Sequence, residues 1–114
     1  MSNEDNIQAI ERNIAKAKSA MDLGTALERL RINRDFKKIV LEGYFEQEAI
    51  RLVHLKADPN MQKPESQLAI LNQIDAIGTL VQYFNTVMFR ADLASKSISD
   101  DEAMRDELIE EDAK

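Results

Sequence analysis

The sequence predicts an all-α protein built around a long antiparallel helical hairpin. Three observations support this fold class. Gly and Pro together account for only five of the 114 residues. Strong helix formers are abundant, and apolar residues recur at spacings of three and four over long segments. The predicted domain spans residues 1–98, with the hairpin over about 35–96, an additional N-terminal helix before it, and a short acidic C-terminal helix in a tail of residues 99–114.

The N-terminal helix is expected over residues 4–22. Its apolar residues follow alternating spacings of three and four, which form a narrow seam suited to one partner helix. Gly24 then predicts the end of this helix, and Thr25 to Glu28 has the spacing of a capping box that starts a short new one. A single bent helix through this point is the alternative. The seam residues proposed for self-association are Ile7, Ile10, Ile14 and Met21.

The first arm of the hairpin is expected from about residue 35 to residue 57. Asn33 or Asp35 is suited to cap its beginning, and Pro59 disfavours helix at Asp58, so residues 58–63 form the main turn. Its apolar residues cover more than one face, which predicts that the helix is covered on most sides.

The second arm is expected over about 64–96, with Pro64 as its first residue. Its apolar stripe repeats with spacings of four and three from Ile70 to Ala91. Gly43 and Gly78 lie inside the two arms at some cost in helix propensity. Close approach between helices and a tolerated defect are equally good explanations of both glycines.

The acidity of the chain is concentrated in its tail. Ser99 to Glu102 has capping-box spacing, which predicts a separate short helix over about 100–111. Residues 99–114 carry eight acids and two bases, a net charge of −6, whereas residues 1–98 hold 13 of each sign. The acids proposed as a partner contact are Asp100, Asp101, Glu102, Asp106, Glu107, Glu110, Glu111 and Asp112.

No constellation of residues points to catalysis, a metal or a cofactor. The chain has no cysteine, and its one histidine, His54, has Arg51 and Ile50 as helix neighbours. A di-iron bundle requires Glu-x-x-His, which does not occur beside Glu42 and Glu46. No phosphate loop, nucleophile elbow or zinc motif is present. We therefore expect a protein that is not an enzyme and that carries no cofactor.

One basic run interrupts the otherwise mixed charges. It contains Arg29, Arg31, Arg34, Lys37 and Lys38 within ten residues. Such a run can contact phosphates, but it has only Phe36 as an interleaved aromatic and lies in no recognisable nucleic-acid motif. A solvated helix face, or a surface that receives the acidic tail of the same or a neighbouring chain, is the favoured interpretation. Nucleic acid is the less favoured partner.

Long helices in a short chain bury little surface by themselves, so the apolar residues predict a partner. A homo-oligomer is favoured over a monomeric three-helix bundle in which the N-terminal helix folds back. No stretch approaches the roughly 20 apolar residues of a membrane span, and no signal peptide is apparent. The expected location is the cytoplasm.

The stretch from Leu27 to Pro59, LERLRINRDFKKIVLEGYFEQEAIRLVHLKADP, together with the later ILNQIDAI run, resembles small helical proteins of tailed bacteriophages. The likeness covers about residues 27–95. It implies a viral source, so the host cytoplasm or the virion becomes the expected location, and another viral or host protein becomes the expected partner. It carries over no functional residues.

The favoured function is that of a phage-type helical structural or assembly protein that self-associates and packs on a larger component. The alternative is a phage regulatory or counter-defence protein that binds and blocks a host factor. In that case the acidic tail would imitate nucleic acid.

Overall fold

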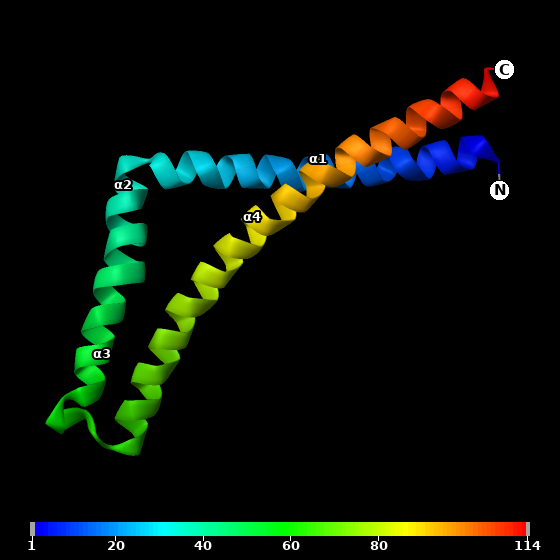
Figure 1. The fold of residues 1–114 in the computed structure, drawn as a ribbon. Coiled ribbons are helices and arrows are strands. Elements are labelled where there is room, and N and C mark those ends of the chain that lie inside the picture. The colour runs from blue at the N-terminus through cyan, green and yellow to red at the C-terminus, as the bar shows by residue number, and fades with distance from the viewer. Residues whose placement is uncertain (1, 114) are drawn as a thin grey trace. The chain divides into compact units, whose positions relative to one another are not determined.

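The computed structural model describes residues 2–113, and all of its secondary structure is helical, which confirms the predicted all-α class. The elements are labelled in Figure 1. They are α1 (Asn3–Ile32), α2 (Arg34–Phe36), the π-helix η1 (Lys37–Glu48), α3 (Ala49–Ala57), the short 3₁₀-helix η2 (Pro59–Met61) and α4 (Pro64–Asp112). The chain forms two compact units. Unit 1 combines the residues up to Leu27 with those from Thr86 onward, and unit 2 is Glu28–Asn85.

Unit 1 is an antiparallel pair made by the first part of α1 and the last part of α4 (Figure 1). At one end, the Asn3 side-chain amide donates a hydrogen bond of 3.0 Å to the carboxylate of Asp112. At the other end, Gly24 lies against Ala91. Moving 21 residues forward along α1 therefore moves the partner 21 residues back along α4. The pair keeps one register throughout.

The seam of unit 1 follows the spacing that the sequence predicts for the N-terminal helix. Ile10, Ile14 and Leu27 are buried on α1, and Val87 and Ala94 are buried on α4. Repeats of three and four residues keep one narrow face of each helix toward the other, as in coiled coils. Burial of these apolar side chains is the main source of stability for a pair of this kind.

Gly24 does not end a helix, because α1 continues to Ile32. Of the two alternatives, the single helix through this point is the one found, and no separate helix starts at Thr25. A Cβ atom added at Gly24 would lie only 2.5 Å from the Cβ of Ala91. Glycine at this position allows the two helix backbones to approach each other closely. The physical reason for Gly24 is therefore packing within unit 1 rather than helix termination.

The expected break at Ser99 is also absent. α4 runs without interruption to Asp112, so the acids of residues 99–112 belong to the end of a 49-residue helix. Half-buried positions continue the seam beyond Ala94 at Ile98, Asp101, Arg105 and Leu108. This tertiary packing favours a continuous helix over the local capping preference of Ser99.

Unit 2 begins at Glu28, near the end of α1, and the first break in the helical chain is at Asn33. Its side-chain oxygen accepts a hydrogen bond of 2.9 Å from the Phe36 N–H, which confirms Asn33 as a helix cap. After the one turn of α2, the backbone continues as η1, which has i→i+5 pairing. The π-helix was not predicted, and none of its residues is fully buried.

The turn between α3 and α4 is fixed by side-chain amides. The Gln67 amide donates to the backbone carbonyls of Lys56 and Met61 at 2.9 and 2.8 Å. The Gln62 amide donates to the carbonyls of Lys56 and Asp58 at 3.0 and 2.7 Å. These bonds satisfy carbonyls that the end of a helix leaves without partners. Pro64 is the first residue of α4, as the sequence predicts.

The core of unit 2 lies between α3 and the first part of α4. Leu52, Ile70 and Ile77 form its buried cluster, with exposed fractions of 1%, 1% and 5%. Toward η1 the packing becomes aromatic, because the ring centroid of Phe84 lies 5.7 Å from that of Phe45 and 6.0 Å from that of Phe36.

The two other glycines do not mediate close helix–helix approach. A Cβ atom at Gly78 would have no neighbour within 4 Å, and one at Gly43 would meet only the Lys38 carbonyl of its own helix, at 3.0 Å. The interpretation of close approach is therefore wrong for both positions, and it holds instead for Gly24.

Candidate functional site

One exposed apolar surface of unit 2 lies on α3 and the beginning of α4. Four large side chains form it, and we call them the apolar face: Ile50, Val53, Leu68 and Leu71, with exposed fractions of 56%, 59%, 60% and 41%. Within each helix the two members are three residues apart, so they share one side of it. Large apolar side chains that are exposed together indicate a surface for contact with another molecule.

The seam predicted for self-association has a different place. Ile10 and Ile14 are buried within unit 1, and Ile7 and Met21 are half-buried there. These side chains pack inside the chain, so they present no free surface for a second copy. Spacing alone does not identify the helix that covers such a seam, and in this structure α4 covers it.

All five cations of the basic segment are exposed: Arg29, Arg31, Arg34, Lys37 and Lys38. They are distributed over the end of α1, the single turn of α2 and the beginning of η1. The break at Asn33 lies among them, so they do not form one continuous helix face. Arg31 and Lys37 line the same hollow.

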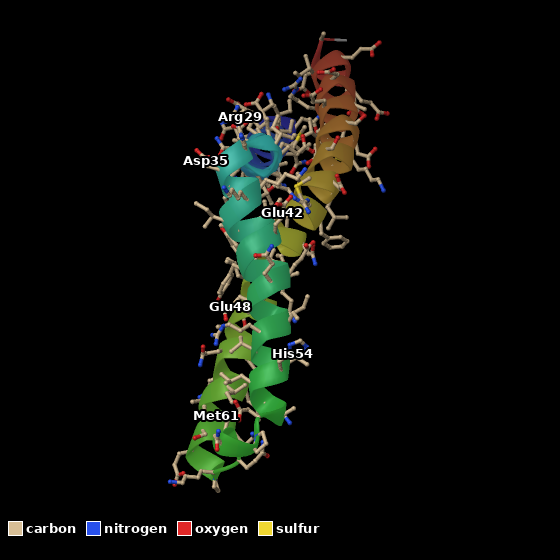
Figure 2. The ribbon with its side chains drawn as sticks, turned by 90° about the vertical axis from the view of Figure 1, so that its left-hand side faces the viewer. Arg29, Asp35, Glu42, Glu48, His54 and Met61 are labelled. Carbon is tan, nitrogen blue, oxygen red and sulfur yellow. The ribbon has the colours of Figure 1, made fainter. Side chains whose placement is uncertain are left out.

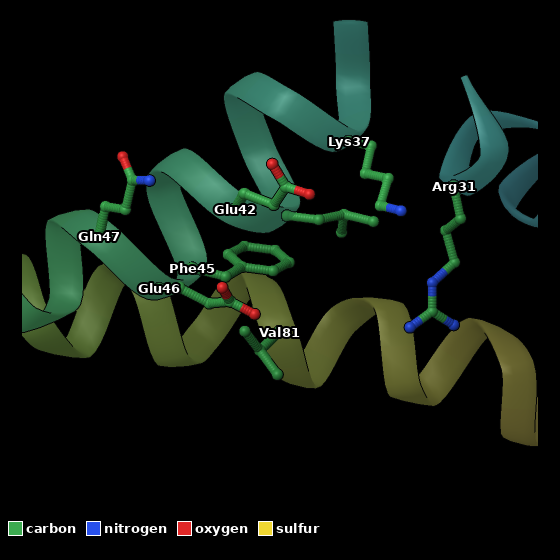
Figure 3. A pocket seen from close by; sticks show the side chains of 8 residues that line it. Arg31, Lys37, Glu42, Phe45, Glu46, Gln47 and Val81 are labelled. Atoms are coloured by element: carbon green, nitrogen blue, oxygen red, sulfur yellow. The ribbon is translucent and has the colours of Figure 1, made fainter. Parts of the chain in front are cut away.

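This hollow is an open cavity of about 610 Å³ in unit 2 (Figure 3). Its lining is Arg31, Lys37, Leu41, Glu42, Phe45, Glu46, Gln47 and Val81. The ring of Phe45 lies between the side chains of Glu42 and Glu46, while the guanidinium of Arg31 lies apart from both carboxylates (Figure 3). The cavity combines an apolar floor with charges of both signs, which suits contacts with an amphiphilic side chain or ligand.

The lining of the cavity includes no Ser, Thr, Cys or His. His54 is exposed on α3 (Figure 2) and is not part of the lining. Among residues 2–113, no group of three or more His, Asp or Glu side chains is placed to hold a metal ion.

The acidic residues of the tail form an ordered helical surface in unit 1, which we call the acidic end. Six of the eight acids are exposed, and Asp101 and Glu102 are half-buried. Asn3 holds this helix end on α1 through its bonds to Glu111 and Asp112. Unit 1 contains thirteen acids and seven bases and accounts for the net charge of −6, whereas unit 2 contains eight of each.

Within the part of the chain that the structure describes, no helix is both long and apolar enough to cross a membrane. Comparisons with protein-family models, characterised proteins and solved structures find no match to this chain.

Proposed function

We propose that this protein is a non-enzymatic helical structural or assembly component that acts through protein–protein contacts, including contacts between copies of itself. Within the bacteriophage setting that the sequence resemblance implies, its role would be in the virion or in virion assembly, alongside a larger component. The apolar face is the single observation that carries this proposal.

Two features of the apolar face support contact with a protein rather than with a small molecule. Its four side chains extend over two helices and are 41–60% exposed, so they form a surface rather than an enclosed pocket. The helices below it are held rigidly by the buried pair Leu52 and Ile70 and by the amide bonds of the turn. A preorganised apolar surface loses little entropy when a partner covers it.

The test replaces two members of the apolar face by acids. We expect the protein to form oligomers at micromolar concentrations and the double variant Val53→Glu, Leu68→Glu to weaken association by at least about tenfold, because a carboxylate is costly to bury in an apolar contact. Light scattering across a dilution series measures this change. Both side chains are more than half exposed, so the fold should survive the substitutions.

The matched control places the same number of charges on α4, away from the apolar face, at the exposed residues Ala69 and Gln73. Ala69→Glu, Gln73→Glu should associate like the unmodified protein. If the unmodified protein is monomeric throughout the series, the self-association part of the proposal fails. Equal weakening by both double variants would show a general charge effect instead of a contact.

The acidic end favours a second candidate function, the binding and inhibition of a host nucleic-acid-binding protein by acidic mimicry. Its charges lie on a continuous helix that Asn3 anchors, so they have a fixed spacing rather than that of a mobile tail. An array of carboxylates on a rigid support resembles the regular charge of a nucleic-acid backbone.

Charge removal without truncation tests this second function, because residues 99–112 also contribute to the packing of unit 1. The variant carries five substitutions: Asp100→Asn, Asp106→Asn, Glu107→Gln, Glu110→Gln and Glu111→Gln. Displacement of labelled DNA from a panel of host DNA-binding proteins, measured by fluorescence anisotropy, should require at least about tenfold more of this variant. The matched control neutralises five exposed acids of unit 2: Glu28, Asp35, Glu42, Glu46 and Glu65. No displacement by the unmodified protein excludes the mimicry.

A further inference from the structure

The cavity of unit 2 is built mainly by the π-helix η1, which supplies six of its eight lining residues. Two rows with a step of five residues account for most of them: Lys37, Glu42 and Gln47, and Leu41 and Glu46. In a π-helix, residues five apart lie on adjacent turns, whereas in an α-helix they point about 140° away from one another. The π-helical pairing therefore gathers side chains that an α-helix would disperse.

The charged side chains of the lining form two groups of opposite sign. Figure 3 shows the heads of Arg31 and Lys37 on one side of the hollow and the carboxylates of Glu42 and Glu46 toward the other side. We call Arg31 and Lys37 the cationic pole, and Glu42 and Glu46 the anionic pole. The poles carry equal and opposite formal charges, so a ligand that suits both must itself carry both signs.

The two poles do not pair with each other. All four side chains are exposed. The ion pairs found within residues 2–113 join Arg51 to Glu48 and Arg105 to Asp106, so none of them joins the two poles. Each pole can therefore form charge-assisted hydrogen bonds to an opposite charge on a ligand.

Apolar side chains complete the lining. Phe45, Leu41 and Val81 are all half-buried. The ring of Phe45 lies between the side chains of Glu42 and Glu46 (Figure 3), and a ring in this position favours an ammonium group, because the ring and both carboxylates attract a cation. Leu41 and Val81 provide apolar surface for the methylene groups of an aliphatic stem.

We propose that this cavity binds a molecule that carries an ammonium group and a carboxylate at the two ends of a flexible aliphatic stem. The ammonium lies beside Phe45 at the anionic pole, the carboxylate lies at the cationic pole, and the stem packs on Leu41 and Val81. The site goes beyond the proposed function, because its lining shares no residue with the apolar face.

Simpler classes of ligand each leave part of this lining opposed. A polyanion such as a nucleic acid would bring phosphates to the anionic pole, and a polycation would bring its charges to the cationic pole. Like charges brought together in this way disfavour binding. A wholly apolar ligand would cover charged side chains without giving them partners, which is also costly. Only a ligand with both charges satisfies both poles.

Titration calorimetry with ε-aminocaproate tests the proposed ligand class. Hexylamine and hexanoate have stems of the same length but lack the carboxylate and the ammonium, respectively. We expect ε-aminocaproate to bind at least about fivefold more tightly than either, because each exposed charge contact adds a modest increment to the affinity. Equal affinities for the three molecules would overturn the assignment of two poles.

Charge removal at each pole tests the location of the site. Glu42→Gln, Glu46→Gln removes the anionic pole, and Arg31→Gln, Lys37→Gln removes the cationic pole. Each double variant should weaken the binding of ε-aminocaproate at least about fivefold. Circular dichroism shows whether the variants keep their helical content, which exposed side chains of this kind should not alter.

Matched controls make the same changes of charge outside the lining. Glu65→Gln, Asp75→Asn removes two exposed acids of unit 2, and Arg29→Gln, Lys38→Gln removes two exposed cations next to the cationic pole in sequence. Both should bind ε-aminocaproate like the unmodified protein. Equal weakening by the controls and by the pole variants would show a general charge effect and overturn the site.

Two sources can supply this ligand chemistry, a free amino acid with a terminal ammonium group and a lysine at the carboxyl terminus of a protein. In such a lysine the side-chain ammonium and the carboxylate are separated by the same number of carbons as in ε-aminocaproate. A peptide that ends in lysine is therefore titrated beside the same peptide with a terminal amide. Tighter binding of the free-acid peptide than of ε-aminocaproate, lost in the amide, identifies a protein terminus. Binding of ε-aminocaproate alone identifies a free amino acid, and binding of neither refutes the proposal.

Discussion

Leu52→Ala should lower the free energy of unfolding of unit 2 by about 2–5 kcal/mol. The side chain is 1% exposed and packs in one cluster with Ile70 and Ile77. Removing its branched end leaves a void that the helices cannot close easily, because the amide bonds of the turn hold α3 in register with α4. Denaturant unfolding followed by circular dichroism measures the loss, and hydrogen exchange locates it in unit 2.

Ile39→Ala is the matched control for this experiment. It removes a similar volume from unit 2, but its side chain is 68% exposed, so the change should stay within about 0.5 kcal/mol. Ile70→Ala should match Leu52→Ala in size. The double variant Leu52→Ala, Ile70→Ala should lose less than the two single losses combined, because neighbouring core sites are coupled. Equal losses for Ile39→Ala and Leu52→Ala would contradict the assignment of the core.

Gly24→Ala should destabilise unit 1 although alanine is the better helix former. The new Cβ atom would lie 2.5 Å from the Cβ of Ala91, so the two helices must separate. Overpacking of this kind costs about 1–3 kcal/mol, and the gain in helix propensity offsets about 1 kcal/mol of it. The measurement is thermal or denaturant unfolding, with hydrogen exchange at residues of α1 as the local probe.

Gly78→Ala, at a second helical glycine, should change the free energy of unfolding in the opposite direction. A Cβ atom there meets nothing within 4 Å, so the substitution should raise stability by up to about 1 kcal/mol.

Ala91→Gly added to Gly24→Ala should restore most of the lost stability, because it removes the atom that collides. If Gly24→Ala stabilises the protein as much as Gly78→Ala does, the close approach of α1 and α4 is refuted.

Several local features of the fold were predictable from the sequence because they depend on nearby residues. Asn33 caps α2 and Pro64 begins α4, as side-chain chemistry and the missing N–H of proline dictate. The positions of the α1 seam were also predictable from the spacing of its isoleucines. Its partner was not, since any helix with a matching stripe can cover it.

The errors concern residues whose local preference is overridden by packing. Gly24 and Ser99 have sequence contexts typical of helix boundaries, yet both lie inside helices. The side chain of Ala91 opposite Gly24 explains why this position is glycine. That contact can be recognised only once the register of α1 on α4 is known. The seam of half-buried residues that continues through Ile98 explains why α4 does not end at Ser99. The π-helical turn of η1 leaves no signal in a pattern analysed at the ordinary helical period.

The apolar face was predicted only in outline. Apolar residues on more than one side of the helix at 35–57 indicate that something covers it, but the contact residues that the spacing pattern predicts are those of the N-terminal seam. A usable signal was present in the sequence. Apolar residues occur at the same two offsets around Leu52 and around Ile70, and that coincidence marks one shared side of an antiparallel pair.

The division of the chain into a continuous unit and a discontinuous one has a consequence for the order of folding. Unit 2 is a single stretch of sequence, so its contacts close short loops and can form early, while the chain is still being synthesised. Unit 1 joins residues near both ends, such as Asn3 and Asp112, and must wait for the last turns of α4 to leave the ribosome. Until then the seam of α1 stays uncovered and available to chaperones or to the nascent α4 of a neighbouring chain.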